Sequence, residues 1–181
     1  EFSCENLGTQ EITVTTEDHS GNSTQAPIQV TLLDTLAPIA SLKTATVELK
    51  ADGLTTMTFA DLDNGSLDNC GIESSILSKD TFTCEDLGEN QITITLEDAS
   101  GNVTTATTLV TVTDPAAPVA HLQELTLGLN DLGTVTISSE DIDDGSTDNC
   151  GIESSILSKD TFTCEDLGEN QITITLEDAS G

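Results

Sequence analysis

Apolar residues recur at every second position in several segments of the chain. In segment 92–96 they alternate with threonine, and segment 110–113 has the same pattern. Segments 45–49 and 125–129 also carry an apolar residue at every second position. A period of two is the signature of a β-strand. We therefore expect these segments to form strands of an antiparallel sheet, with an apolar face buried and a threonine-rich face in water.

Residues that favour turns separate these segments. They lie at 52–53, 63–66, 87–90 and 99–102, and the last of these predicts a hairpin. Between positions 36 and 115, the order predicts six or seven short strands and no helical stretch. The fold class that fits is all-β, with tandem immunoglobulin-like β-sandwich domains.

The chain is a tandem repeat, since residues 68–101 return letter for letter as residues 148–181. Tandem copies usually provide length or many weak contacts. We expect the C-terminal part of a truncated repeat at 1–35, a complete immunoglobulin-like repeat at 36–115, and the N-terminal part of a further, truncated repeat at 116–181. The short, proline-containing junctions at 34–38 and 114–118 favour extended linkers and an elongated, semi-rigid rod.

The charge of the chain is strongly negative, with 33 acidic residues, four lysines, no arginine and a formal net charge of −29. Phosphate backbones and anionic membrane surfaces would be repelled, so nucleic-acid partners are not expected. No segment approaches the roughly 20 apolar residues of a membrane span, so direct membrane insertion is not expected either. So much charge favours the recruitment of cations, because it otherwise destabilises compact domains by self-repulsion.

The five cysteines follow the repeat. Cys70 and Cys84 are separated by the same interval as Cys150 and Cys164, and Cys4 is the equivalent of Cys84. Two cysteines per repeat without a C-x-x-C pair or a neighbouring histidine make a poor zinc site, which is the alternative. We predict disulfides Cys70–Cys84 and Cys150–Cys164, with Cys4 left unpaired by truncation. Disulfides favour an oxidising, extracytoplasmic location.

The acidic loop 61–70 and its copy 141–150 are candidates for binding Ca²⁺, which takes six to eight oxygen ligands. In an immunoglobulin-like sandwich this loop, the last hairpin and the N-terminal linker share one end. The alternative is a plain acidic turn, and the loop does not match an EF-hand. The candidate ligands are Asp61, Asp63, Asp68, Glu97, Asp98 and Asp34, with Asp141, Asp143, Asp144, Asp148 and Asp114 in the next repeat.

Catalysis finds no support in the sequence. His19 and His121 are lone histidines whose equivalents in neighbouring repeats are Ala99 and Ser41. The serines lack a G-x-S-x-G motif and a histidine partner. We therefore expect no catalytic residue, no organic cofactor and no enzyme activity.

A set of motifs gives the chain a family resemblance. D-x-D-[ND]-G-S-x-D-N-C-G is followed by T-F-T-C, L-G-x-N-x-I-T-I-T, E-D-x-S-G-N and V-T-V-T-D before A-P. Together they resemble the hyalin-repeat (HYR-like) modules, which are extracellular immunoglobulin-like domains. The near-identical copies are most similar to the large surface adhesins of Bacteroidetes, including the gliding-motility adhesins of flavobacteria. The resemblance implies an extracellular protein at the cell surface.

The function we expect is that of a repetitive stalk or filament segment of a cell-surface adhesin. Its partners would be neighbouring repeats of the same chain, together with surface glycans or extracellular substrata. Two alternatives stay open. One is a calcium-dependent carbohydrate-binding module, which the lack of stacking aromatic residues disfavours, and the other is the stalk region of a secreted enzyme.

Overall fold

The computed structural model describes residues 1–180 and consists mostly of β-strands, which confirms the all-β prediction. The chain divides into two compact units. The first unit contains residues 1–45, 58–80 and 91–109, and the second contains residues 46–57, 81–90 and 110 onward. The repeat boundaries expected after residues 35 and 115 stay predictions.

Twelve strands and five short helical turns make up the described chain. The strands are β1 (Gly8–Glu17), β2 (Ser23–Leu32), β3 (Ala45–Glu48), β4 (Leu54–Thr56), β5 (Ile72–Leu77), β6 (Thr81–Thr83), β7 (Gly88–Asp98), β8 (Val103–Thr113), β9 (Thr134–Thr136), β10 (Ile152–Leu157), β11 (Thr161–Thr163) and β12 (Ile174–Asp178). The helical turns are α1 (Phe59–Leu62), α2 (Ser139–Ile142), η1 (Cys4–Asn6), η2 (Cys84–Asp86) and η3 (Cys164–Asp166).

Antiparallel pairing organises the strands. The largest sheet has four strands in the order β3-β8-β7-β5, and β7 and β8 form the hairpin expected at residues 99–102. Two-stranded sheets are formed by β1 with β2, β4 with β6, β9 with β11, and β10 with β12. These pairings recur with the period of the sequence, since β4–β6 corresponds to β9–β11 and β5–β7 to β10–β12.

The core lies where the sequence alternation predicts it. In the first unit, Ile92, Ile94 and Leu96 of β7 are at most 1% exposed, while the threonines between them are half-buried. In the second unit, Val110 and Val112 of β8 are equally buried. Burying one such side chain stabilises the fold by about 1.5–3 kcal/mol. The alternation therefore does set the buried face of these two strands.

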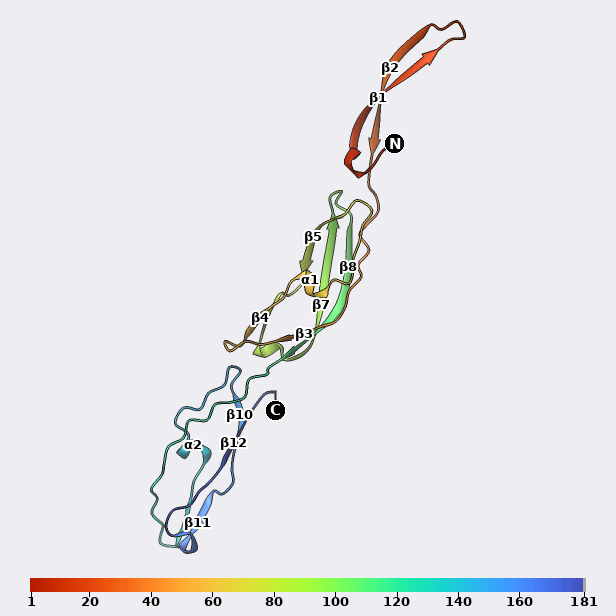
Figure 1. The fold of residues 1–181 in the computed structure, drawn as a ribbon. Helices are drawn as coiled ribbons and strands as arrows, with labels where there is room; N and C mark the ends of the chain where they lie inside the picture. Colours follow the sequence, from red (N-terminus) through yellow and green to blue (C-terminus); the bar gives the residue numbers. More distant parts are fainter. Residues whose placement is uncertain (181) are drawn as a thin grey trace. The chain divides into compact units, whose positions relative to one another are not determined.

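The hairpin β1–β2 (Figure 1) has the same alternation, but most of its side chains are exposed. Ile12 lies opposite Ile28, and these side chains are 36% and 49% exposed. Their equivalents in β7 and β8 are buried or half-buried residues of the larger sheet. Strand pairing supplies hydrogen bonds, but only a second layer of side chains removes an apolar face from water.

Two sequence expectations about the elements are wrong. Short helical turns do form, and α1 begins because the carboxylate of Asp61 accepts hydrogen bonds from the backbone and hydroxyl groups of Thr58, at 2.8 and 2.9 Å. Segment 125–129 is not a strand, although its equivalent β3 is. The edge strand β3 lies beside β8, and no described strand occupies that position next to 125–129.

The predicted disulfides Cys70–Cys84 and Cys150–Cys164 are wrong. Cys4 is bonded to Cys70 and Cys84 to Cys150, with Cα–Cα distances of 5.4 and 5.3 Å that are ordinary for disulfides. Both bonds have a sequence separation of 66. Cys164 is the free cysteine among the described residues, and Cys4, which was expected to be unpaired, is bonded.

The strand pairing explains why the two cysteines of one predicted repeat do not join. The residues between Cys70 and Cys84 form β5 and β6, and these strands pair with β7 and β4 rather than with each other. No hairpin therefore brings the two cysteines back together. Each bond instead joins the first residue of a 3₁₀ turn (η1 or η2) to the Asp-Asn-Cys-Gly loop of the next predicted repeat.

Candidate metal centre

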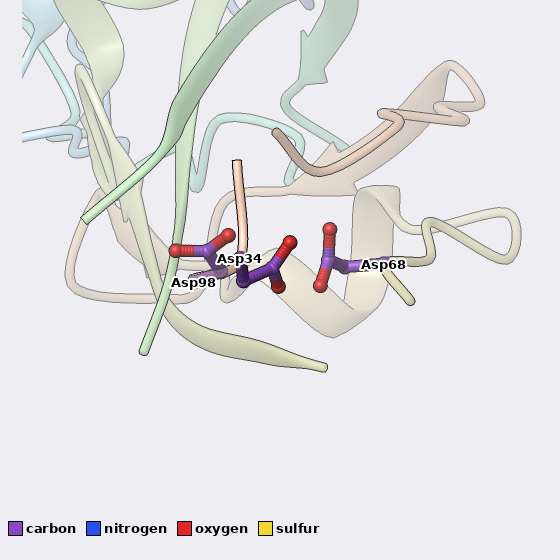
Figure 2. A group of neighbouring side chains, drawn as sticks. All are labelled: Asp34, Asp68 and Asp98. Carbon is purple, nitrogen blue, oxygen red and sulfur yellow. The ribbon is translucent and has the colours of Figure 1, made fainter. Parts of the chain in front are cut away.

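Three aspartates from separate parts of the first unit meet in one cluster. Asp34 follows β2, Asp68 lies in the loop after α1, and Asp98 ends β7. One carboxylate oxygen from each lies within 4.8 Å of the others. Figure 2 shows the carboxylate of Asp34 between those of Asp68 and Asp98. We call these three residues the aspartate cluster.

Asp98 is held by the turn that it starts. Its carboxylate accepts hydrogen bonds from the backbone N–H groups of Ser100 and Asn102, at 2.8 and 2.9 Å, and from the Asn102 side chain at 2.8 Å. The side-chain hydrogen bond from Asn102, followed by the backbone bonds, holds the pKa of Asp98 below its usual 3.8, although desolvation acts in the opposite direction. Asp98 is 2% exposed, so the sheet presents a buried, charged carboxylate at the end of β7.

Asp68 is fixed by its own loop. Its Oδ1 accepts hydrogen bonds from the backbone N–H groups of Cys70 and Gly71, at 2.8 and 3.0 Å. These bonds form a tight turn in which the side chain replaces a backbone acceptor. Gly71 has a φ of 101°, a region that favours glycine. The Asp-Asn-Cys-Gly sequence therefore sets the position of the Asp68 carboxylate and of the disulfide at Cys70 together.

Asp34 is held by two loops distant in sequence. Its Oδ1 accepts hydrogen bonds from the Leu36 backbone at 3.1 Å and from the Asn69 side chain at 3.2 Å. Asn102 donates a further bond to the Asp34 carbonyl oxygen at 3.2 Å. The remaining carboxylate oxygen, Oδ2, has less than 1 Å² of accessible surface and no hydrogen-bond partner. A buried polar atom without a partner is unusual in a native fold.

The equivalent residues of the second unit are Asp114, Asp148 and Asp178. Asp114 again accepts bonds from the backbone two residues on (Ala116, 3.0 Å) and from an asparagine side chain (Asn149, 3.1 Å). Oδ2 of Asp114 and Oδ2 of Asp148 are both buried without a hydrogen-bond partner. The arrangement of the linker aspartate is therefore repeated with the period of the sequence.

Asp178 was missing from the sequence-based candidates. It is 7% exposed at the end of β12, and its carboxylate accepts a hydrogen bond from the Ser180 backbone at 2.7 Å. It occupies the same position within the identical segment 148–181 that Asp98 occupies within 68–101, so the repeat alone was sufficient to find it.

The other predicted ligands lie outside the cluster, where two of them stabilise local turns. Asp61 caps α1, and its hydrogen bonds from Thr58 lower its pKa. Asp63 accepts a bond from the Ser66 backbone at 2.8 Å, which also lowers its pKa. Glu97 is exposed, because strand alternation directs it to the face opposite Asp98. None of these three belongs to the aspartate cluster.

The equivalent acidic residues of the next repeat have equivalent hydrogen-bond partners. Asp141 caps α2 through Ser138, at 2.7 and 2.9 Å, and Asp143 accepts a bond from the Ser146 backbone at 3.0 Å. Asp144 is exposed. The acidic loop predicted as one calcium-binding unit thus contributes a single residue, Asp68, to the aspartate cluster, and its copy does not take part in such a cluster among the described residues.

The chain has no match among models of known protein families or among curated protein sequences. In residues 1–180, no helix is both long enough and apolar enough to cross a membrane. The all-β fold and its two disulfides are compatible with an immunoglobulin-like protein of an oxidising compartment.

Proposed function

We propose that this chain is a repetitive segment of an extracellular, cell-surface adhesin, in which it forms a semi-rigid stalk or filament of immunoglobulin-like, HYR-like repeats. The observation that carries the proposal is the pair of disulfides Cys4–Cys70 and Cys84–Cys150, which have the same sequence separation of 66. With the predicted repeat boundaries, each bond joins one repeat to the next. A covalent joint at every junction suits a protein that bears tension along its length.

The junction sequences support the same function. Asp34 and Asp114 each fix the start of a proline-containing linker through bonds to backbone N–H groups and to the asparagine of the next loop. A linker with such bonds loses the freedom of a flexible tether. The charge of −29 keeps neighbouring stalks apart and hydrated. Stiffness and reach, with multivalent surface contacts as a further role, are the properties that these features provide.

The proposal is tested on cells of the source organism. Antibodies against the repeat should label intact cells, and brief external protease treatment should remove the label. Shortening the array one repeat at a time should reduce attachment progressively. Replacing the lost repeats with unrelated rigid domains of equal length should restore attachment if the repeats act as a spacer, whereas failure to restore it would assign the adhesive contact to the repeats themselves. Labelling confined to permeabilised cells would refute the extracellular stalk.

A further inference from the structure

We propose that Asp34, Asp68 and Asp98 bind one divalent cation, with Ca²⁺ as the cation that fits best. The equivalent aspartates of the next repeat, Asp114, Asp148 and Asp178, do not form a cluster of this spacing in the described chain. The proposed site belongs wholly to the first unit. The proposal does not depend on the stalk function, because it rests on the chemistry of three side chains.

The strongest argument is the buried oxygen of Asp34. Its Oδ2 has less than 1 Å² of accessible surface and no hydrogen-bond partner, beside two further carboxylates. A buried carboxylate oxygen in that position lacks both water and a donor, which is costly unless a cation compensates it. In the described chain no lysine forms an ion pair with the cluster. The equivalent oxygen of Asp114 is also buried without a hydrogen-bond partner.

The turn geometry alone does not require this arrangement. Asp18 is the equivalent of Asp98 in the hairpin β1–β2, and it accepts the same bonds from the Asn22 backbone and side chain, both at 2.9 Å. Asp18 is exposed and stands outside any cluster of the described residues. The turn therefore forms without neighbouring acids. The meeting of Asp98 with Asp34 and Asp68 is therefore set by the linker and by the loop after α1, not by the turn that Asp98 starts.

The spacing of the oxygens leaves a position for a cation of the size of Ca²⁺. Calcium–oxygen distances of about 2.3–2.6 Å place ligands on opposite sides of the ion about 4.8 Å apart. Three oxygens within 4.8 Å of one another can all lie within about 2.8 Å of a common point, which is close to the calcium–oxygen distance. Three carboxylate oxygens occupy only part of the coordination shell of Ca²⁺, and water or carbonyl oxygens can occupy the rest because this shell is flexible. Mg²⁺ instead needs a tighter octahedron, with ligand distances of about 2.0–2.1 Å.

The site is connected directly to the disulfide. Asp68 belongs to the cluster, Asn69 donates to Asp34, and Cys70 is bonded to Cys4. Three consecutive residues thus contact the cation site, the linker and the disulfide in turn. Cation binding would restrain the linker residues after Asp34 next to the loop that the disulfide already holds in place.

The test is calorimetric titration of Ca²⁺ into the metal-free chain at neutral pH and about 0.15 M salt, which screens unspecific attraction to the net charge. We expect one specifically bound ion per chain. The double variant Asp34→Asn and Asp68→Asn should lose it, or bind it at least about tenfold more weakly. Asparagine keeps an Oδ1 acceptor for the local turns, so circular dichroism without metal should match the wild type.

The matched control is the double variant Asp61→Asn and Asp63→Asn. It removes the same amount of charge from aspartates outside the cluster, and we expect it to leave the stoichiometry at one. Equal loss in both double variants, or unchanged binding in the Asp34 and Asp68 variant, would overturn the proposal. Wild-type binding that is weak, unsaturable and abolished by the added salt would overturn it as well.

Hydrogen exchange locates the ion independently. The Leu36 amide donates to Asp34 and the Cys70 amide donates to Asp68, so Ca²⁺ should slow exchange in peptides covering 33–38 and 66–71. Peptides covering 58–63, which contain Asp61, should not change. Protection confined to 58–63 would move the ion to the acidic loop and refute the cluster as the site.

Discussion

Stretching a single molecule from its two ends distinguishes the observed disulfides from the pairing expected from sequence. Each observed bond has a sequence separation of 66, and the enclosed chain cannot extend while the bond is intact. At about 3.3–3.6 Å per extended residue, one intact bond hides roughly 220–240 Å of chain. Reduction should therefore lengthen the fully unfolded chain by roughly 230 Å per bond. Bonds within one predicted repeat, such as Cys70–Cys84, would hide only about 50 Å each.

The assay is optical-tweezers or atomic-force extension of the whole chain, with and without reductant. The variant Cys84→Ser with Cys150→Ser should show one increment of about 230 Å on reduction, because one bond remains. The control Cys164→Ser should match the wild type, since Cys164 is free. Reduction increments of only about 50 Å, or an altered length for the control, would refute the pairing described here.

Three further predictions concern the free thiol of Cys164, the glycine Gly53 beside the Cys84 sulfur, and the pH dependence of stability. Iodoacetamide should label one cysteine of the native, unreduced chain, and peptide mapping should identify Cys164; a label on any other cysteine would contradict the two bonds. Gly53→Ala should lower the free energy of unfolding by more than the roughly 1–2 kcal/mol of its positive φ (70°), because the new Cβ would lie 2.9 Å from the Asn149 carbonyl oxygen and 3.0 Å from the Cys84 sulfur. Gly65→Ala, with a φ of 90° and open space, should cost only that backbone strain in urea titrations, and equal costs would contradict the contact. Because hydrogen bonds lower the folded-state pKa of Asp98 below 3.8, its contribution to stability is present above that pH and lost as the pH falls through the lower folded value. Asp98→Asn should weaken this acid-induced decrease in melting temperature, and an unchanged pH profile would contradict the assignment.

The sequence predicts what depends on near neighbours. The alternation of apolar residues in β7 determines its buried face, and the turn at residues 99–102 determines its hairpin. The same alternation fails for segment 125–129, because an edge strand also needs a partner that lies far away in sequence. Local pattern predicts the tendency of a segment, whereas pairing is decided by the rest of the chain.

The candidate site was also predicted only in part from the sequence. Asp34, Asp68 and Asp98 were among the predicted ligands because the expected sandwich places linker, loop and hairpin at one end. The hydrogen bonds that direct Asp61 and Asp63 to capping and turn formation depend on side-chain geometry, which composition does not reveal. The disulfides were mispredicted because the nearest cysteine in sequence was taken as the partner.

During oxidation, an unfolded chain can form the same incorrect bond between Cys70 and Cys84. In an unstructured chain, the short loop between Cys70 and Cys84 closes about tenfold more readily than the long loop between Cys4 and Cys70, from the length dependence of loop entropy alone. Cys70 thus meets Cys84 more often than it meets Cys4 before folding. The native bonds must be selected later, once the strands between Cys70 and Cys84 hold these cysteines apart, or by thiol exchange. Correct disulfide formation in this chain would then depend on folding ahead of oxidation, or on a thiol–disulfide isomerase in the compartment where the bonds form.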